Sequence, residues 1–154
     1  MAGDKHTPKQ ICLRMGFLIY CFVMLWLLFG QRISADSQQA QMLVNWNFTP
    51  LKTIRLYLNI LSKSKNTDLI VHAFINLAGN VVMFIPLGFL LPYIYKKCRK
   101  FWLCMLTVLC IMAAVEAVQY LTCLGSCDVD DLLLNLPGAV IGFVIWKSSK
   151  TIRP

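Results

Sequence analysis

Four long apolar segments limit what this chain can fold into. They cover about residues 11–30, 69–95, 101–121 and 128–146. A helix rises about 1.5 Å per residue, so roughly 20 apolar residues are needed to cross the hydrocarbon core of a bilayer. Each segment has about that length, and helices satisfy their own backbone groups inside lipid. We therefore predict an all-α integral membrane protein with four transmembrane helices.

The composition agrees with a membrane protein and argues against other classes. Hydrophobic residues make up 58% of the chain and charged residues 14%, whereas soluble domains are about half apolar and a quarter charged. The net charge of +8 comes from Lys and Arg clusters that flank the apolar segments, without interleaved aromatic residues. This pattern is typical of membrane topology and excludes nucleic acid as a partner. We expect one membrane domain over residues 1–154.

The first apolar segment has two interpretations. A basic tail followed by an apolar run also resembles a cleaved signal peptide, but residues 30–35 offer only a weak small-residue cleavage site. We predict a retained helix. With the amino terminus inside, most of the 15 Lys and Arg residues fall on the cytoplasmic side. We therefore expect a multi-pass protein with both termini in the cytoplasm.

Residues 50–62 lie between the first two spans and have an amphipathic pattern. Thr49 and Pro50 could cap and begin a helix. Its apolar face would carry Leu51, Ile54, Leu58 and Leu61. We predict a helix in the membrane interface, with Trp46 and Tyr57 at the level of the lipid head groups. An amphipathic cover over the helix bundle is the alternative.

Polar side chains recur inside three of the apolar segments. The helical rise places them in the outer half of a ~30 Å hydrocarbon core, where polar groups are costly and often functional. Because the segments deliver them to similar depths, we predict one outward-facing polar pocket. Its candidate ligand-binding residues are Asn76, Asn80, Glu116, Gln119, Asp128, Asp130, Asp131 and Asn135.

Each of these features also has a purely structural explanation. The aspartates could cap the fourth helix, and we expect one of them to do so. The amides could serve as interhelical hydrogen-bond partners. The spacing of Gly138 and Gly142 is typical of close helix packing. Capping does not explain Glu116, which lies inside the preceding apolar helix.

The chemistry of the pocket stays open at this level. Glu116, Asp128 and Asp131 could act as catalytic acids or bases, or as hard oxygen ligands for a divalent cation such as Mg²⁺. No dedicated cofactor is indicated, and the identity of any metal is not determined. A zinc set of His72, Cys123 and Cys127 is a weaker alternative. Whether the protein is an enzyme is therefore undecided.

Three motifs resemble the VanZ-like family of bacterial membrane proteins. They are NLAGNVVMFIPLGFLLP in the second span, ExxQ at Glu116 and Gln119, and GSCDVDDLLLNLPGAVIG around the fourth. The segment NWNFTPL at residues 45–51 also resembles the family, although Leu51 replaces the usual Phe and Ser126 stands where some members carry Arg. The resemblance extends over about residues 45–146.

The resemblance implies a protein of the bacterial cytoplasmic membrane, in a family linked to teicoplanin-type glycopeptide resistance. The family motif positions coincide with the polar set above, together with Pro86, Gly88 and Gly138. Our leading hypothesis is a cell-envelope protein that binds a lipid-linked cell-wall precursor or a lipidated glycopeptide in the outward pocket. The alternatives are a metal-assisted hydrolase or transferase acting on a lipid-linked substrate, and a proton-coupled carrier. Membrane lipids and a second copy of the chain are the other expected partners.

Overall fold

The structure is a computed structural model, and it describes residues 8–30, 47–122 and 128–151. These ranges are almost wholly helical, and within them no β-strand is formed beyond one isolated bridge. Four helices are long and apolar enough to cross a membrane. They are Gln10–Phe29, Thr67–Ile94, Phe101–Thr122 and Val129–Ser149. The predicted all-α fold with four membrane spans is confirmed.

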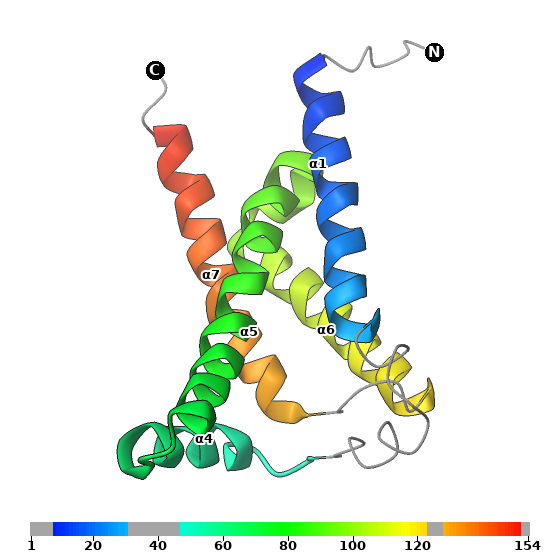
Figure 1. Cartoon of the computed structure of the whole chain (residues 1–154). Helices are drawn as coiled ribbons and strands as arrows, with labels where there is room; N and C mark the ends of the chain where they lie inside the picture. The colour runs from blue at the N-terminus through cyan, green and yellow to red at the C-terminus, as the bar shows by residue number, and fades with distance from the viewer. Residues whose placement is uncertain (1–7, 31–46, 123–127, 152–154) are drawn as a thin grey trace.

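The helices form a bundle with a separate short helix across one end (Figure 1). The elements in chain order are α1 (Pro8–Leu25), the π-helical turn η1 (Trp26–Gly30), α4 (Lys52–Lys63), α5 (Thr67–Ile94), the 3₁₀ turn η2 (Lys96–Arg99), α6 (Phe101–Thr122) and α7 (Val129–Thr151). The start of α1 and the end of α7 lie at the same end of the bundle, and α4 lies across the opposite end. That end is called the α4 end below.

The centre of the bundle is the crossing of α5 and α7. Three glycines lie where the two helices cross. A Cβ atom on Gly138 would lie 2.0 Å from the backbone oxygen of Val81, and one on Gly142 would lie 2.0 Å from that of Ile85. Gly88 of α5 meets the backbone oxygen of Ala139 in the same way, again at 2.0 Å. The two backbones are therefore in direct contact, as expected for small residues spaced four apart in membrane helices.

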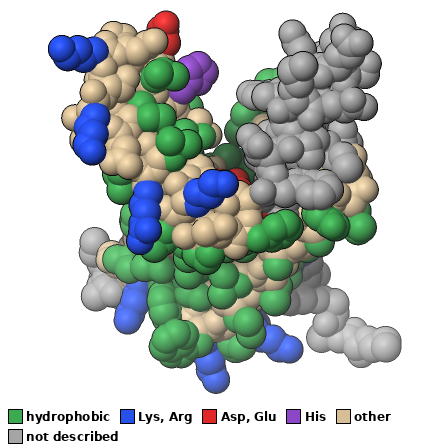
Figure 2. Space-filling view, turned by 90° about the horizontal axis from the view of Figure 1, so that it is seen from below, with side chains coloured by type: hydrophobic (Ala, Val, Ile, Leu, Met, Phe, Trp, Pro, Cys, Tyr) green, Lys and Arg blue, Asp and Glu red, His purple; other side chains and the backbone are tan. Residues whose placement is uncertain are grey.

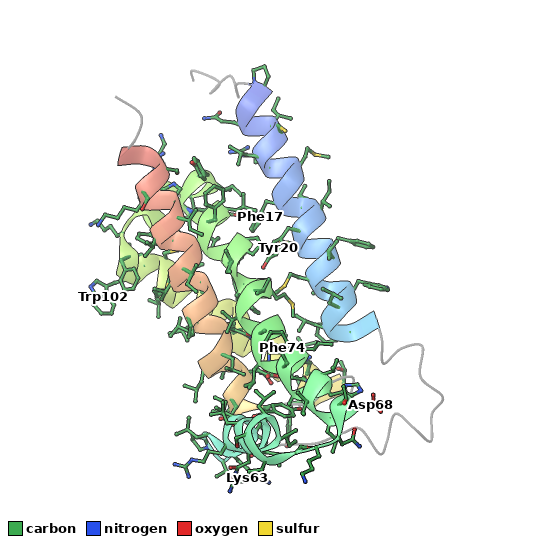
Figure 3. The ribbon with its side chains drawn as sticks, turned by 60° about the vertical axis from the view of Figure 1, so that its left-hand side comes forward. Phe17, Tyr20, Lys63, Asp68, Phe74 and Trp102 are labelled. Carbon is green, nitrogen blue, oxygen red and sulfur yellow. The ribbon has the colours of Figure 1, made fainter. Side chains whose placement is uncertain are left out.

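Helix α1 packs on the outside of this pair. The Tyr20 hydroxyl donates a hydrogen bond of 2.8 Å to the backbone oxygen of Met83 on α5. Phe17 and Tyr20 both pack against the apolar core, and Figure 3 shows the two side chains directed toward α5. Most other large side chains of α1 are exposed, as expected of a helix that faces lipid.

The short helix α4 covers residues 52–63, close to the predicted range of 50–62, but it begins differently from the prediction. The N-cap position is Leu51, whose φ of 64° lies in the left-handed region and whose side chain makes no capping bond. The expected cap at Thr49 is therefore wrong. A left-handed leucine is costly, and it persists only when tertiary contacts fix it. No residue of α4 is fully buried, and Trp46 lies outside the described residues.

Candidate functional site

A buried carboxylate from α7 supplies the missing cap of α4. The Asp130 side chain is completely inaccessible to solvent. Its Oδ1 accepts a hydrogen bond from the backbone amide of Leu51, and its Oδ2 accepts from those of Thr53 at 2.7 Å and Ile54 at 3.1 Å. Free amides and the positive end of the helix dipole favour an anion at this position. Asp130 therefore fixes the first turn of α4 onto the start of α7.

Asp128 strengthens the same contact. Its Oδ1 accepts from Asn47 Nδ2 at 3.0 Å, and its Oδ2 accepts from Thr53 Oγ1 at 2.6 Å. The backbone oxygen of Asn47 accepts in turn from the amide of Val129 at 3.1 Å. We call Asn47, Thr53, Asp128 and Asp130 the α4 clamp. Both of its carboxylates are already committed to structural hydrogen bonds.

The prediction that one aspartate caps the fourth helix is confirmed for Asp128. Its Oδ1 accepts from the Asp130 amide at 2.9 Å, and its backbone oxygen accepts from the Asp131 amide at 3.0 Å. These are the bonds of an N-cap residue. Asp130, in contrast, caps a different helix.

Asp131 points toward α5 instead of α4. Its Oδ1 accepts a hydrogen bond of 2.7 Å from Asn80 Nδ2. It also lies close enough to Asp128 and Glu116 to interact electrostatically with both. The predicted convergence of polar groups from α5, α6 and α7 is therefore present at Asn80, Glu116 and Asp131. None of the α4 clamp bonds uses the Asp131 side chain.

Glu116 joins the polar cluster to a groove in the surface. Its Oε2 accepts from the backbone amide of Asp128 at 3.2 Å. The same residue lines a groove of about 250 Å³ with Phe48, Ala117 and Tyr120. The Phe48 and Tyr120 rings meet edge to face with centroids 6.4 Å apart. Figure 2 looks at the α4 end and shows acidic atoms recessed in a hollow of the surface.

Tyr57 of α4 also faces the acidic cluster. Burial raises the pKa of its phenol above the usual value of 10.0, and the negative charges of Asp131 and Asp128 raise it further. The sequence pattern predicts Tyr57 only at the level of the lipid head groups. The sequence analysis also missed Asn47, Phe48 and Thr53, although the first two lie in the recognised segment at residues 45–51.

Three predicted residues lie elsewhere or deeper. Asn76 is exposed, and its Nδ2 donates to the His72 backbone oxygen of its own helix at 2.9 Å. Gln119 is buried and donates from Nε2 to the Leu28 backbone oxygen at 3.5 Å, so it faces η1. Asn135 follows Asp131 by about one helical turn and is buried, and its Oδ1 has no hydrogen-bond partner among the described residues.

A cation-binding role stays a prediction. Within residues 8–30, 47–122 and 128–151, no three His, Cys, Asp or Glu side chains form a group that could hold a metal ion. Cys123 and Cys127 of the alternative zinc set lie outside these ranges. Among the candidate ligands, Asp128 accepts hydrogen bonds with both oxygens, which leaves Glu116 and Asp131 as the carboxylates outside the α4 clamp.

A family model described as VanZ/LLP1 matches residues 17–152. This range contains the whole candidate site and all of the described elements except the first residues of α1. Neither curated proteins nor solved structures match the chain.

Proposed function

Because the chain belongs to the VanZ/LLP1 family, we propose that it is a cell-envelope membrane protein that binds a lipidated ligand at the α4 end. The ligand is a lipid-linked cell-wall precursor or a lipoglycopeptide, and binding contributes to resistance to teicoplanin-type antibiotics. The predicted orientation places this end on the outer face of the cytoplasmic membrane, where such ligands occur.

The position of Glu116 carries the proposal. Its side chain lies between an apolar groove lined by Phe48 and Tyr120 and the polar pair of Asn80 and Asp131. Phe48 is 61% exposed and Tyr120 is 44% exposed, so a ligand in the membrane can reach both rings. A site with one apolar side and one charged side suits a molecule that has an acyl chain and a polar head.

The charges of the site restrict the head group. Glu116 and Asp131 favour hydroxyl or ammonium groups, because carboxylates are hydrogen-bond acceptors and attract cations. A phosphate would need a cation between itself and these carboxylates. Val118 and Leu121, on the same helix as Glu116 and Tyr120, are 47% and 79% exposed. An acyl chain would lie along these side chains in the membrane.

The test is antibiotic susceptibility of a sensitive Gram-positive host that expresses the wild type, Glu116→Gln or Asp68→Asn at matched membrane levels. Gln keeps an oxygen that can accept from the Asp128 amide, so the local fold is retained. Asp68→Asn is the matched control, because Asp68 is exposed at the start of α5 and outside the site (Figure 3). We expect the wild type and Asp68→Asn to raise teicoplanin tolerance and Glu116→Gln to lose that effect.

Two results would contradict the proposal. One is unchanged tolerance in cells that contain the wild type, and the other is full tolerance with Glu116→Gln. A direct binding measurement distinguishes recognition of the acyl chain from recognition of the glycopeptide core. If the acyl chain is recognised, teicoplanin should bind the protein in lipid nanodiscs more tightly than vancomycin does. Stoichiometric Mg²⁺ or Mn²⁺ binding that is lost in Asp131→Asn would instead support the metal-assisted hydrolase or transferase.

A further inference from the structure

A second cavity lies at the opposite end of the bundle from the candidate site. It has a volume of about 90 Å³ and lies between α1, the end of α5 and η2. Three cationic residues line it, namely Arg14, Lys96 and Arg99. Arg14 comes from a different helix than the other two, so the positive charge depends on the packing of α1 against α5. Gln10 and Tyr93 add polar groups to the wall.

The surroundings of the cavity are strongly positive. Lys97 and Lys100 lie in the same connection between α5 and α6. The carboxylates placed above lie at the α4 end, in the clamp, at Asp131, at Glu116 and at the start of α5. An anionic group that enters the cavity would therefore be attracted by three cationic side chains at once. A small cavity with converging Arg and Lys side chains has the donor set of a phosphate site.

The position of the cavity favours a phosphate that belongs to a lipid. Arg14 lies four residues inside the first membrane span, which begins at Gln10, so it lies about 6 Å from the start of that span. Its neighbours Ile11 and Met15 are both more than half exposed, as expected of apolar side chains that face lipid. Cationic side chains at such a depth meet the phosphates of the leaflet, and basic pockets between membrane helices bind anionic head groups.

A neighbouring hollow provides room for the rest of a lipid. It has a volume of about 520 Å³, and it shares Ile94 and Lys96 with the smaller cavity. Cys98 and Thr107 line its other side. The small cavity, at about 90 Å³, has room for several atoms the size of a water molecule, which occupies about 30 Å³ in the liquid. It is therefore large enough for a phosphate group. The larger hollow is suited to the glycerol part of the same molecule.

We propose that the cavity lined by Arg14, Lys96 and Arg99 binds the phosphate of an anionic phospholipid in the leaflet opposite α4. The site is separate from the candidate site and does not depend on the proposed function. An occupied site joins α1 to the end of α5 through a shared anion, in addition to the Tyr20 contact with Met83. Anionic lipid therefore holds the peripheral helix α1 against the bundle.

The experiment measures thermal stability of the purified full chain in detergent while phosphatidylglycerol is added. Phosphatidylcholine with the same acyl chains is the neutral control, and glycerol phosphate tests the anion without a lipid. We expect a saturable rise in the melting temperature with phosphatidylglycerol only. Arg14→Gln and Lys96→Gln should each need about five times more lipid for the half-maximal effect.

Lys100→Gln is the matched variant, because it removes the same charge one residue from Arg99 and lines neither cavity. It should leave the lipid titration almost unchanged. An equal weakening by Lys100→Gln would mean that only diffuse surface charge acts, and this would overturn the proposal. Equal effects of the two phospholipids would overturn it as well. If glycerol phosphate gave the same stabilisation as phosphatidylglycerol, the site would serve a free anion and not a lipid.

Discussion

The Asp130 carboxylate accepts a hydrogen bond of 2.7 Å from the backbone amide of Thr53, although 77 positions separate the two residues. This contact ties the short helix α4 to the start of the last membrane helix. It also decides how the acidic cluster is used. Asp128 and Asp130 hold α4 in place, and Glu116 and Asp131 are left to shape the pocket.

The first prediction concerns the cap of α4. Asp130→Asn should destabilise the protein by about 2–3 kcal/mol, because an amide offers one acceptor oxygen where three backbone amides at the start of α4 require partners. SDS denaturation in mixed micelles measures the loss, and faster proteolysis within α4 should accompany it. Asp68→Asn, at an exposed position, should change the free energy of unfolding by less than about 0.5 kcal/mol. Equal stability of the two variants would contradict the role of the α4 clamp.

The second prediction concerns the crossing of α5 and α7. Gly138→Ala should cost about 1–3 kcal/mol or more, because the new methyl group would overlap the Val81 backbone and the helices would have to separate. Gly79→Ala on α5 is the matched control, since no heavy atom lies within 4 Å of the position of its Cβ. This control should be neutral or slightly stabilising, because Ala favours the helix over Gly. Thermal denaturation of both variants tests the contrast.

The third prediction separates function from stability at Asp131. The Asp131→Asn and Asn80→Ala variants should both reduce teicoplanin tolerance, while their unfolding free energies should fall less than that of Asp130→Asn. The reason is that the Asn80 to Asp131 bond lies outside the α4 clamp. A double-mutant cycle should give a coupling energy of at least about 0.5 kcal/mol. Additive effects of the two substitutions would show that the 2.7 Å contact carries no energy.

The fourth prediction is a pH dependence that arises from Tyr57. Its pKa is raised in the folded protein by burial and by the charges of Asp131 and Asp128. Above pH 10 the unfolded chain therefore loses this proton first, so the free energy of unfolding should fall as the pH rises through the pKa of the folded state. Tyr57→Phe should remove this part of the alkaline destabilisation. Asp131→Asn should lower the pKa of the Tyr57 phenol, because it removes one of the negative charges that raise it. The pKa of Tyr57 is measured as the difference between the ultraviolet pH titrations of the wild type and of Tyr57→Phe. The loss of stability is measured by unfolding the two proteins over the same pH range.

The sequence by itself determined the four membrane helices and the short amphipathic helix between the first two, because hydrophobic length and periodicity are local properties of the chain. It also indicated that Asn80, Glu116 and Asp131 converge, since residues at similar depths in packed helices can meet. The spacing of the glycines in α7 predicted close helix packing. In the structure the backbone of α7 at Gly138 lies in contact with the backbone of α5 at Val81.

Only the tertiary structure decided which polar residues share the pocket and which aspartates are structural. Asn76 and Asn80 are four residues apart and share one face of α5, about 6 Å apart along its axis, so the packing of the neighbouring helices decides which of them meets a partner. Asn76 bonds within its own helix, whereas Asn80 reaches Asp131. Likewise, the spacing of Asp128, Asp130 and Asp131 says nothing about a helix start more than 70 positions away. The amides of α4 become their partners only when the folded chain brings them together.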